Sequence, residues 1–251
     1  MVPGEMGARE LETHGDEPVF VRDAVFEPID TPTAVDEVAR RIRQAIVLGV
    51  LRDGDRLPAE TELAKRIGVG VMTVRAALSE LRADGLLVTH RGRLGGSFVA
   101  SSDKALLAGG GSEDPAELRR QAEILGGLEA LAARLAADRI TADEVGVLED
   151  LAAEIAGTRS PRDVGLLNNR FHLTIAAASG NRDLVSEISS RRAELFATVF
   201  AISGLRLPIE SDAEPHAEIL RALATRDGQA AAEAMWEHHR STLEAVLRAA
   251  P

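Results

Sequence analysis

The 251 residues, 45% of them hydrophobic, can bury one large core or two ordinary ones, and the absence of cysteine excludes disulfide bonds and thiolate metal sites. No stretch reaches the roughly 18 to 20 uninterrupted apolar residues of a membrane span or contains the apolar core of a signal peptide, so we expect a cytoplasmic protein. The net charge is −11, but residues 1–30 hold two basic and eight acidic residues, residues 31–100 eleven and eight, and residues 113–251 fifteen and twenty-three. Only the middle block is therefore a candidate for binding a polyanion.

The composition favours a mainly α-helical protein in two folded units. Aromatic residues make up 3% of the chain, and alanine-rich stretches such as "LEALAARLAA" favour closely packed helices. Residues 1–30 are acidic, contain prolines and lack apolar periodicity, which predicts a flexible leader. "SSDKALLAGGGSEDP", with its glycine triplet, predicts a linker over residues 101–114. Folded units are expected on either side of it, at residues 31–100 and 115–251.

The first unit follows the element order of a winged helix-turn-helix. "TAVDEVARRIRQAIVLGV" has apolar residues at helical spacing and ends its helix at Gly49, and "AETELAKRIG" predicts a shorter helix that ends at Gly68. "VMTVRAALSELRADG" predicts a third helix, whose apolar face is formed by Val74, Ala77, Leu78 and Leu81. "LLVTHR", "GRLGG" and "SFVA" then predict a strand, a turn and a return strand. The third helix is the element expected to enter a DNA major groove.

The third helix begins with residues that form helices poorly, which is expected where a helix end serves DNA contact rather than folding. The Thr73 hydroxyl can reach a phosphate or a base edge, and the Arg75 guanidinium can bind phosphate or guanine. In the wing, flexible glycines and basic residues suit contact with the DNA backbone or minor groove, the residues being His90, Arg91 and Arg93. The alternative is that these are ordinary solvated charges. The order of elements and the basic composition together favour a DNA interface.

The segment "AIVLGVLRDGDRLPAETELAKRIGVGVMTVRAALSELRADGLLVTHRGRLGGSFV" resembles the DNA-binding domain of GntR-family transcriptional regulators over nearly all of residues 35–100. The shared motifs are Leu-Pro-x-Glu, Gly-Val, Val-Arg-x-Ala-Leu and a glycine-rich wing. The chain departs from the family at Asp53-Gly54, where Pro-Gly is usual, at Thr61, where an arginine is frequent, and at Gly70-Val71, where Ser/Thr-Arg is usual. The resemblance implies DNA binding in which Thr61 occupies a contact position, while Arg75 and the wing supply more of the affinity.

Residues 115–251 predict an all-α antiparallel bundle. Apolar periodicity and short turns divide this stretch into six helices, at residues 115–138, 141–157, 161–179, 182–203, 212–225 and 228–249. Because the interior of a helical bundle commonly holds ligands and metals, we expect this unit to bind an effector and to carry the dimer contacts.

Four of the six histidines lie in this second unit. His172 shares a helix face with Asn168, four residues earlier, and His216 begins an apolar stripe that directs it into the bundle. His238 and His239 are adjacent, so we expect only one of them to point inward, and the stripe alone favours His239. A single inward histidine is usually a hydrogen-bonded core residue. Three from three helices need partners, and one divalent ion satisfies them together.

"NNRFHLTIAAASGN", "PHAEILRALATRD" and "AAEAMWEHH" resemble the FCD ligand-binding domain of the FadR-type branch of the same family. Many such domains hold a metal through an Asp or Asn and three histidines. The resemblance therefore selects His238 over His239 and implies the ligand set Asn168, His172, His216 and His238. Imidazole and amide donors suit Zn²⁺, with Ni²⁺ as the alternative. Leu125 stands where the family frequently has an arginine that pairs with an effector carboxylate.

These patterns predict a homodimeric transcriptional regulator, acting as a repressor, whose two winged helices bind a pseudo-palindromic operator. A small metabolite such as an organic acid or sugar acid, bound beside the metal, is expected to change its affinity for DNA. Two alternatives remain. One is a dimeric DNA-binding protein in which the metal is purely structural. The other is a metal-dependent hydrolase, because a three-histidine site can activate water. No catalytic base can be named in the sequence, so we do not expect an enzyme.

Overall fold

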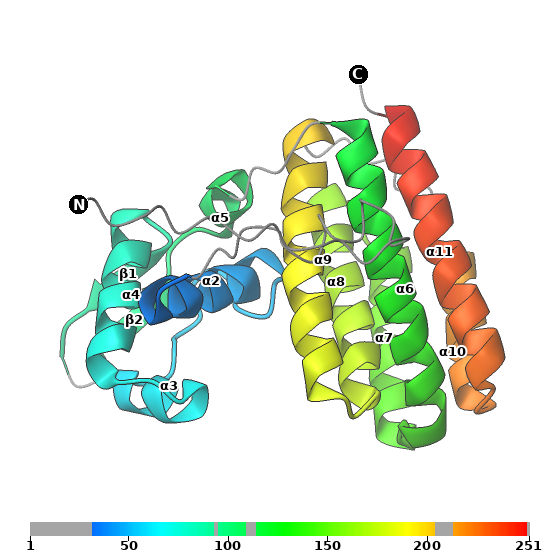
Figure 1. The fold of residues 1–251 in the computed structure, drawn as a ribbon, viewed down its shortest axis with the longest axis horizontal. Helices are drawn as coiled ribbons and strands as arrows, with labels where there is room; N and C mark the ends of the chain where they lie inside the picture. The colour runs from blue at the N-terminus through cyan, green and yellow to red at the C-terminus, as the bar shows by residue number, and fades with distance from the viewer. Residues whose placement is uncertain (1–31, 93–94, 109–113, 204–212, 250–251) are drawn as a thin grey trace, which may run out of the picture. The chain divides into compact units, whose positions relative to one another are not determined.

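The computed structural model describes residues 32–92, 95–108, 114–203 and 213–249. The predicted leader at residues 1–30 and the wing residue Arg93 lie outside these residues. Within them the chain forms ten α-helices and one two-stranded sheet, which confirms the predicted mainly α fold (Figure 1). None of these helices is both long and apolar enough to cross a membrane.

The N-terminal part is a winged helix-turn-helix, the arrangement predicted from the sequence. Its elements are α2 (Ala34–Val47), α3 (Glu60–Ile67), α4 (Val71–Ala83), β1 (Leu87–His90) and β2 (Gly96–Val99). Helix α3 ends at Gly68, whose φ of 82° lies in the left-handed region that glycine adopts without strain. The chain therefore turns sharply into α4, the predicted recognition helix. The strands pair antiparallel, from Leu87 opposite Val99 to His90 opposite Gly96.

This part has its own apolar core, formed where the helices bury one face each. Residues from α2, α4 and the hairpin are at most 5% exposed there, including Val38, Ile42, Ile46, Val74, Leu78, Leu81, Leu87 and Val99. The four residues that were predicted to form the apolar face of α4 are all buried. Packing of this face, rather than helix propensity, therefore stabilises α4.

The predicted linker contains a helix that the sequence reasoning missed. Helix α5 (Ser102–Ala108) occupies its first half, and Ala105 and Leu106 are fully buried in the winged-helix core. The short apolar segment "KALLA" lies directly before a glycine triplet, and the triplet favoured the prediction of a linker. The tie between the winged helix and the second unit is also closer than a flexible linker implies, because Arg40 and Gln44 of α2 both donate to the Ser190 hydroxyl of the bundle, at 2.9 and 3.0 Å.

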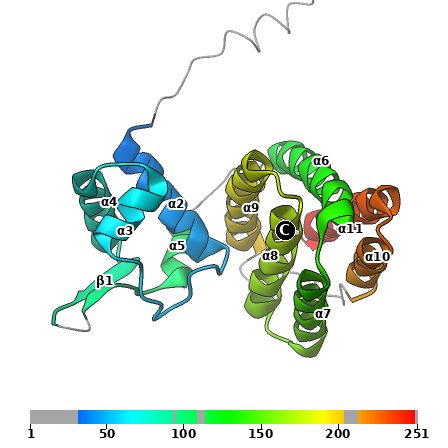
Figure 2. The same cartoon turned by 90° about the horizontal axis from the view of Figure 1, so that it is seen from below.

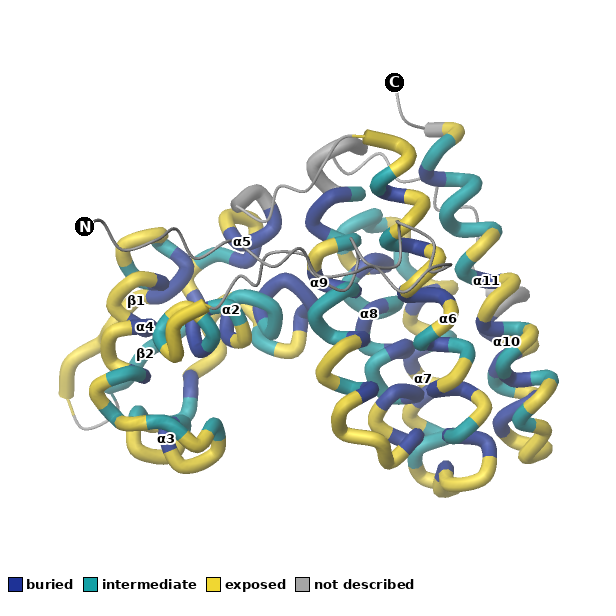
Figure 3. The backbone as a smooth tube through the Cα atoms, viewed as in Figure 1, coloured by how far each residue is buried: buried dark blue, intermediate teal, exposed yellow. Residues whose placement is uncertain are grey.

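The C-terminal part is a helical bundle, seen nearly end-on in Figure 2. Its helices begin and end within one residue of the predicted positions: α6 (Pro115–Arg139), α7 (Ala142–Gly157), α8 (Pro161–Ala178), α9 (Arg182–Ser203), α10 (Ala213–Ala224) and α11 (Gly228–Ala249). Local signals explain this agreement. Thr141 and Glu144 form a capping box, and Asp114 and Ser160 cap helices whose first residue is proline. Buried and exposed residues alternate along each helix, so each contributes one face to the interior (Figure 3).

Gly165 allows α8 and α9 to approach closely, and replacing it with alanine is expected to destabilise the bundle. A Cβ atom at this position would lie 2.5 Å from the Phe196 ring, so the ring or a helix has to move. We expect the free energy of unfolding of Gly165→Ala to fall by about 1–3 kcal/mol, measured by urea denaturation. Gly146→Ala on α7 is the matched control. Its Cβ meets nothing within 4 Å, so this variant should be as stable as the parent or more stable. Equal stability of the two variants would contradict the close approach.

Candidate metal centre and nucleic-acid interface

Three histidines from three helices meet inside the bundle. His172 of α8, His216 of α10 and His238 of α11 are at most 2% exposed, and one ring nitrogen of each lies within 4.8 Å of the others. The Nε2 atoms of His172 and His238 are 3.2 Å apart. The Asn168 Oδ1 atom, which belongs to α8, lies 2.9 Å from His216 Nε2. The structure therefore brings together all four residues that the sequence predicted as metal ligands.

The spacing of two donor nitrogens suits binding to one ion. Two nitrogen ligands at roughly 2.0–2.1 Å from a tetrahedral Zn²⁺ lie about 3.3–3.4 Å apart, close to the 3.2 Å between His172 Nε2 and His238 Nε2. Burial lowers the pKa of His172 to about 3 and lowers the pKa of His238 well below its ordinary value. Both imidazoles are therefore neutral near pH 7, which is the form that binds a metal. The fit rests on these neutral nitrogens and on the amide oxygen beside them.

A buried carboxylate fixes the orientation of His172. Glu129 of α6 is 1% exposed and accepts a hydrogen bond from His172 Nδ1, so the His172 Nε2 lone pair faces the other two histidines. Glu129 also accepts from Arg192 Nη1 at 2.7 Å and contacts His239 Nε2 at 2.5 Å. Burial raises the pKa of Glu129, but Arg192 and the two histidines lower it by more. The resulting pKa is well below the usual value of a glutamate. Glu129 is thus an ionised carboxylate.

The sequence reasoning missed Glu129 and its partner Arg192, although one signal was present. Glu129 falls on the buried side of α6, one turn after Leu125 and one turn before Ala133, where an apolar residue would be expected. A charged residue in such a stripe indicates a buried partner.

The expectation that only one of His238 and His239 points inward is wrong. His238 faces the other histidines, and His239, with 12% of its side chain exposed, contacts Glu129. Both reach buried partners because Glu129 lies on α6, which packs closely against α11. At Gly126 of α6, a Cβ atom would lie 3.3 Å from the His239 side chain. The apolar stripe, which favoured His239 as the more buried residue, was also misleading.

A second group of possible ligands consists of Glu129, His172 and His239, and it has His172 in common with the first group. The Arg192 guanidinium is bound to the same Glu129 carboxylate, and its positive charge opposes a cation there. The first group, His172, His216 and His238, does not include this guanidinium-bound carboxylate. They are therefore the better candidate metal site, with Glu129 as a positioning residue.

Replacing Glu129 with glutamine should weaken metal binding without removing a ligand. The amide cannot hold His172 Nδ1–H as strongly as the carboxylate, so the expected loss in affinity is about 10-fold to 100-fold. Competition with a chromophoric chelator measures it. Glu123→Gln, an exposed position on the same helix, is the control and should bind the metal as the parent does. Unchanged affinity in Glu129→Gln would contradict the positioning role.

The predicted DNA-contact residues lie at the start of α4, on α3 and on the wing. Thr61, Arg75, His90 and Arg91 are exposed, Thr73 is half-buried, and Arg93 lies outside the described residues. Arg75 donates from Nε and Nη2 to the Glu60 carboxylate at 3.0 and 2.9 Å, and its Nη1 lies 3.6 Å from the Met72 sulfur. Glu60 thus holds the Arg75 side chain in place at the end of the recognition helix.

Met72 is a surface residue that the sequence reasoning overlooked. It is the second residue of α4 and is 69% exposed, the highest value among the large apolar side chains of the described residues. An apolar side chain at the tip of a recognition helix can contact the methyl group of thymine. The unusual start of α4 therefore presents an apolar and a cationic group side by side.

Comparisons with known proteins identify the family of each part of the chain. Residues 34–99 match the family model "Bacterial regulatory proteins, gntR family", and residues 121–241 match the model "FCD domain". The Glc operon transcriptional activator of Escherichia coli is 33% identical over 174 residues, which cover 65% of this chain and 68% of that protein. A protein of Mycobacterium gastri named "Putative HTH-type transcriptional regulator RmpR" is 28% identical over 233 residues, covering 90% and 85%.

Among solved structures, E. coli McbR/YncC shares the fold, with a TM-score of 0.51 and 19% identity over 87% of this chain and 99% of that one. The relatives are transcriptional regulators and not enzymes, in agreement with the sequence prediction. The first matched segment spans the winged helix, and the second includes the histidine cluster. The chain belongs to the GntR family of bacterial transcriptional regulators, with a DNA-binding winged helix followed by an FCD domain.

Proposed function

We propose that this regulator is a homodimeric, cytoplasmic repressor whose FCD domain binds a divalent metal and a small organic acid or sugar acid. Its two winged helices bind the half-sites of a pseudo-palindromic operator, with Thr61, Thr73, Arg75, His90, Arg91 and Arg93 at the DNA. The metabolite changes operator affinity because it binds two arrangements of the dimer unequally.

The observation that carries the proposal is the cluster of three buried, converging histidines beside Asn168. Asn168, His172, His216 and His238 would hold the ion, and Zn²⁺ is the ion that these donors suit best, with Ni²⁺ as the alternative. Such an ion supplies a positive centre that polarises and binds anionic groups. The chain's own residues orient His172 through Glu129 and exclude water from the cluster.

The charge of the site favours an acidic effector. Three imidazoles and one amide are neutral donors, so they leave the charge of a divalent ion uncompensated, and a carboxylate is the natural counter-ligand. Leu125 is fully buried among apolar residues of α6, α8 and α9, so it contributes no cation to the site. The metal is therefore the group that we expect to bind the effector carboxylate.

Repression follows if the dimer covers promoter DNA until the effector weakens its binding. The Glc operon relative is an activator by name, so whether this protein represses or activates is tested directly. A reporter gene behind the operator should be more active when the regulator gene is deleted. Lower activity after deletion would show activation instead.

The proposal is tested on the purified full chain by elemental analysis and thermal shift. We expect about one ion per chain, and we expect organic acids to raise the melting temperature of the metal-bound protein but not of the chelator-treated protein. A metal-bound protein that ignores every metabolite would support the structural-metal alternative, and conversion of a metabolite would support hydrolysis. Absence of bound metal after incubation with Zn²⁺ or Ni²⁺ would overturn the metal site itself.

A further inference from the structure

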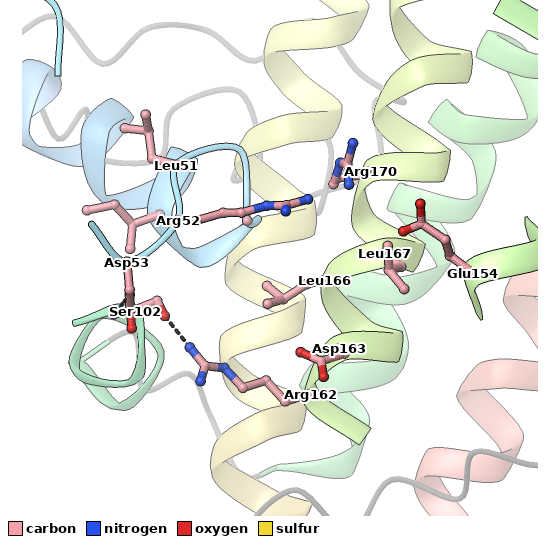
Figure 4. Close-up of a pocket in the computed structure, with 12 residues that line it drawn as sticks. Leu51, Arg52, Asp53, Ser102, Glu154, Arg162, Asp163, Leu166, Leu167 and Arg170 are labelled. Atoms are coloured by element: carbon pink, nitrogen blue, oxygen red, sulfur yellow. Dashed lines mark hydrogen bonds between the residues drawn. The ribbon is translucent and has the colours of Figure 1, made fainter. Parts of the chain in front are cut away.

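A cavity of about 440 Å³ lies where the turn after α2 faces helix α8, and none of the four candidate metal ligands lines it (Figure 4). Leu51, Leu166 and Leu167 give it an apolar wall. Its volume is within the range of small-molecule sites, which are typically apolar with a few placed polar groups. Neither the metal nor the DNA interface uses these residues.

Two arginines from different parts of the chain face this cavity. Arg52 follows α2 and extends toward α8, and Arg170 of α8 lines the same cavity (Figure 4). Within the described ranges, neither guanidinium forms an ion pair or a side-chain hydrogen bond. Two guanidinium groups in one cavity repel each other, and a carboxylate between them offsets that repulsion while accepting hydrogen bonds from both.

The remaining charges limit what can bind. Arg162 is already engaged, because it donates to the Ser102 hydroxyl and lies 3.2 Å from the Asp103 carboxylate. Asp53 accepts a hydrogen bond from the Ser102 backbone at 2.8 Å. Glu154 and Asp163 also line the cavity, so the formal charges of its arginines and carboxylates cancel. A multiply charged anion such as phosphate or citrate is therefore disfavoured, and a single carboxylate has to be bound locally by the two arginines that have no ion pair in the described part of the chain.

We propose that this cavity is a second ligand site, which binds a small monocarboxylate with a short apolar chain. The carboxylate lies between Arg52 and Arg170, and the apolar chain packs against Leu51, Leu166 and Leu167. This site differs from the metal-centred one in position and in chemistry, because two guanidinium groups bind the acid and no metal takes part.

The position of the site gives it a regulatory consequence. Arg52 belongs to the winged helix, and Arg170 lies on α8, two residues from His172. A ligand held by both arginines favours the arrangement of the two parts in which they face each other. By linkage, it also changes the affinity of the winged helix for its operator.

The test measures binding of 3-methylbutanoate to the full chain by isothermal titration calorimetry, with and without prior chelation of the metal. We expect binding in both preparations and weaker binding of acetate, which lacks the apolar chain. Arg52→Gln and Arg170→Gln should each lower the affinity about tenfold, because each loses a charged hydrogen-bond donor. Arg170→Lys, which keeps the charge, should lose less. Arg182→Gln, an exposed arginine outside the cavity, is the control and should bind as the parent does.

Three results would overturn the proposal. The first is failure of the parent to bind 3-methylbutanoate at millimolar concentration, and the second is equal affinity in the parent and in both glutamine variants. The third is binding that disappears on chelation, which would assign the carboxylate to the metal centre. The arginine variants are also compared in the metal-bound protein, so the conclusion does not depend on the stability of the chelated form.

Discussion

Arg75→Ala is expected to weaken operator binding and to flatten its dependence on salt. Arg75 is 54% exposed at the start of the recognition helix, and Glu60 holds its guanidinium in place. Loss of a guanine contact would cost about 1–3 kcal/mol at that base pair, whereas loss of a phosphate contact would weaken all sequences and lower the salt slope by about one. Fluorescence anisotropy with an operator selected from random duplexes, at several salt concentrations, distinguishes these two outcomes.

The control for Arg75 lies on the same helix. Arg82 is in the last turn of α4, far from the end that faces DNA, so Arg82→Ala should change neither the affinity nor the salt slope. An Arg75→Ala variant with the affinity and slope of the parent would contradict the docking of α4. Equal losses in both variants would indicate a general electrostatic effect rather than a contact.

His172→Ala combined with His216→Ala is expected to abolish stoichiometric metal binding. The double change removes two of the three buried nitrogens, and the two donors that remain, on Asn168 and His238, are too few to hold a divalent ion. Elemental analysis should fall from about one ion per chain to none. A chelator should lower the melting temperature of the parent but leave that of the variant unchanged, because a bound ion stabilises the folded state.

The control for the metal prediction is a histidine outside the bundle. His90 lies on the wing and contacts Phe98, so His90→Ala should retain the metal of the parent. Retained metal in the double variant would show that the histidine cluster does not hold the ion. The group around Glu129 and His239 would then become the candidate to test.

The sequence predicts the elements of this protein well because its signals are local. Alanine and leucine at helical spacing, a capping box at Thr141 and prolines at the first positions of α6 and α8 define the bundle helices within one residue. Helix α5 was not predicted because it is short and is stabilised by burying Ala105 and Leu106 in a core built from distant residues. Such tertiary packing leaves little trace in the local pattern.

The sequence predicts the histidines of the candidate metal site but not the buried charged residues beside them. His172, His216 and Asn168 could be located by helix face and family motif. The role of Glu129 depends on α6, α8, α9 and α11 meeting at one point, which brings His172, Arg192 and His239 to one carboxylate. No periodicity within one helix predicts such a meeting. Reasoning helix by helix also favoured His239 as the more buried residue and expected only one of the pair to point inward, whereas partners exist on two sides of α11.

We infer that a metal-bound sensor bundle controls the affinity of the winged helix for DNA. The decisive measurement is the operator Kd of the full chain, metal-bound and chelated, across a titration of the organic acid that shifts its melting temperature. We expect a change in Kd of about 5-fold to 150-fold in the metal-bound protein and little change after chelation. An operator Kd that stays the same at every acid concentration in the metal-bound protein would contradict it.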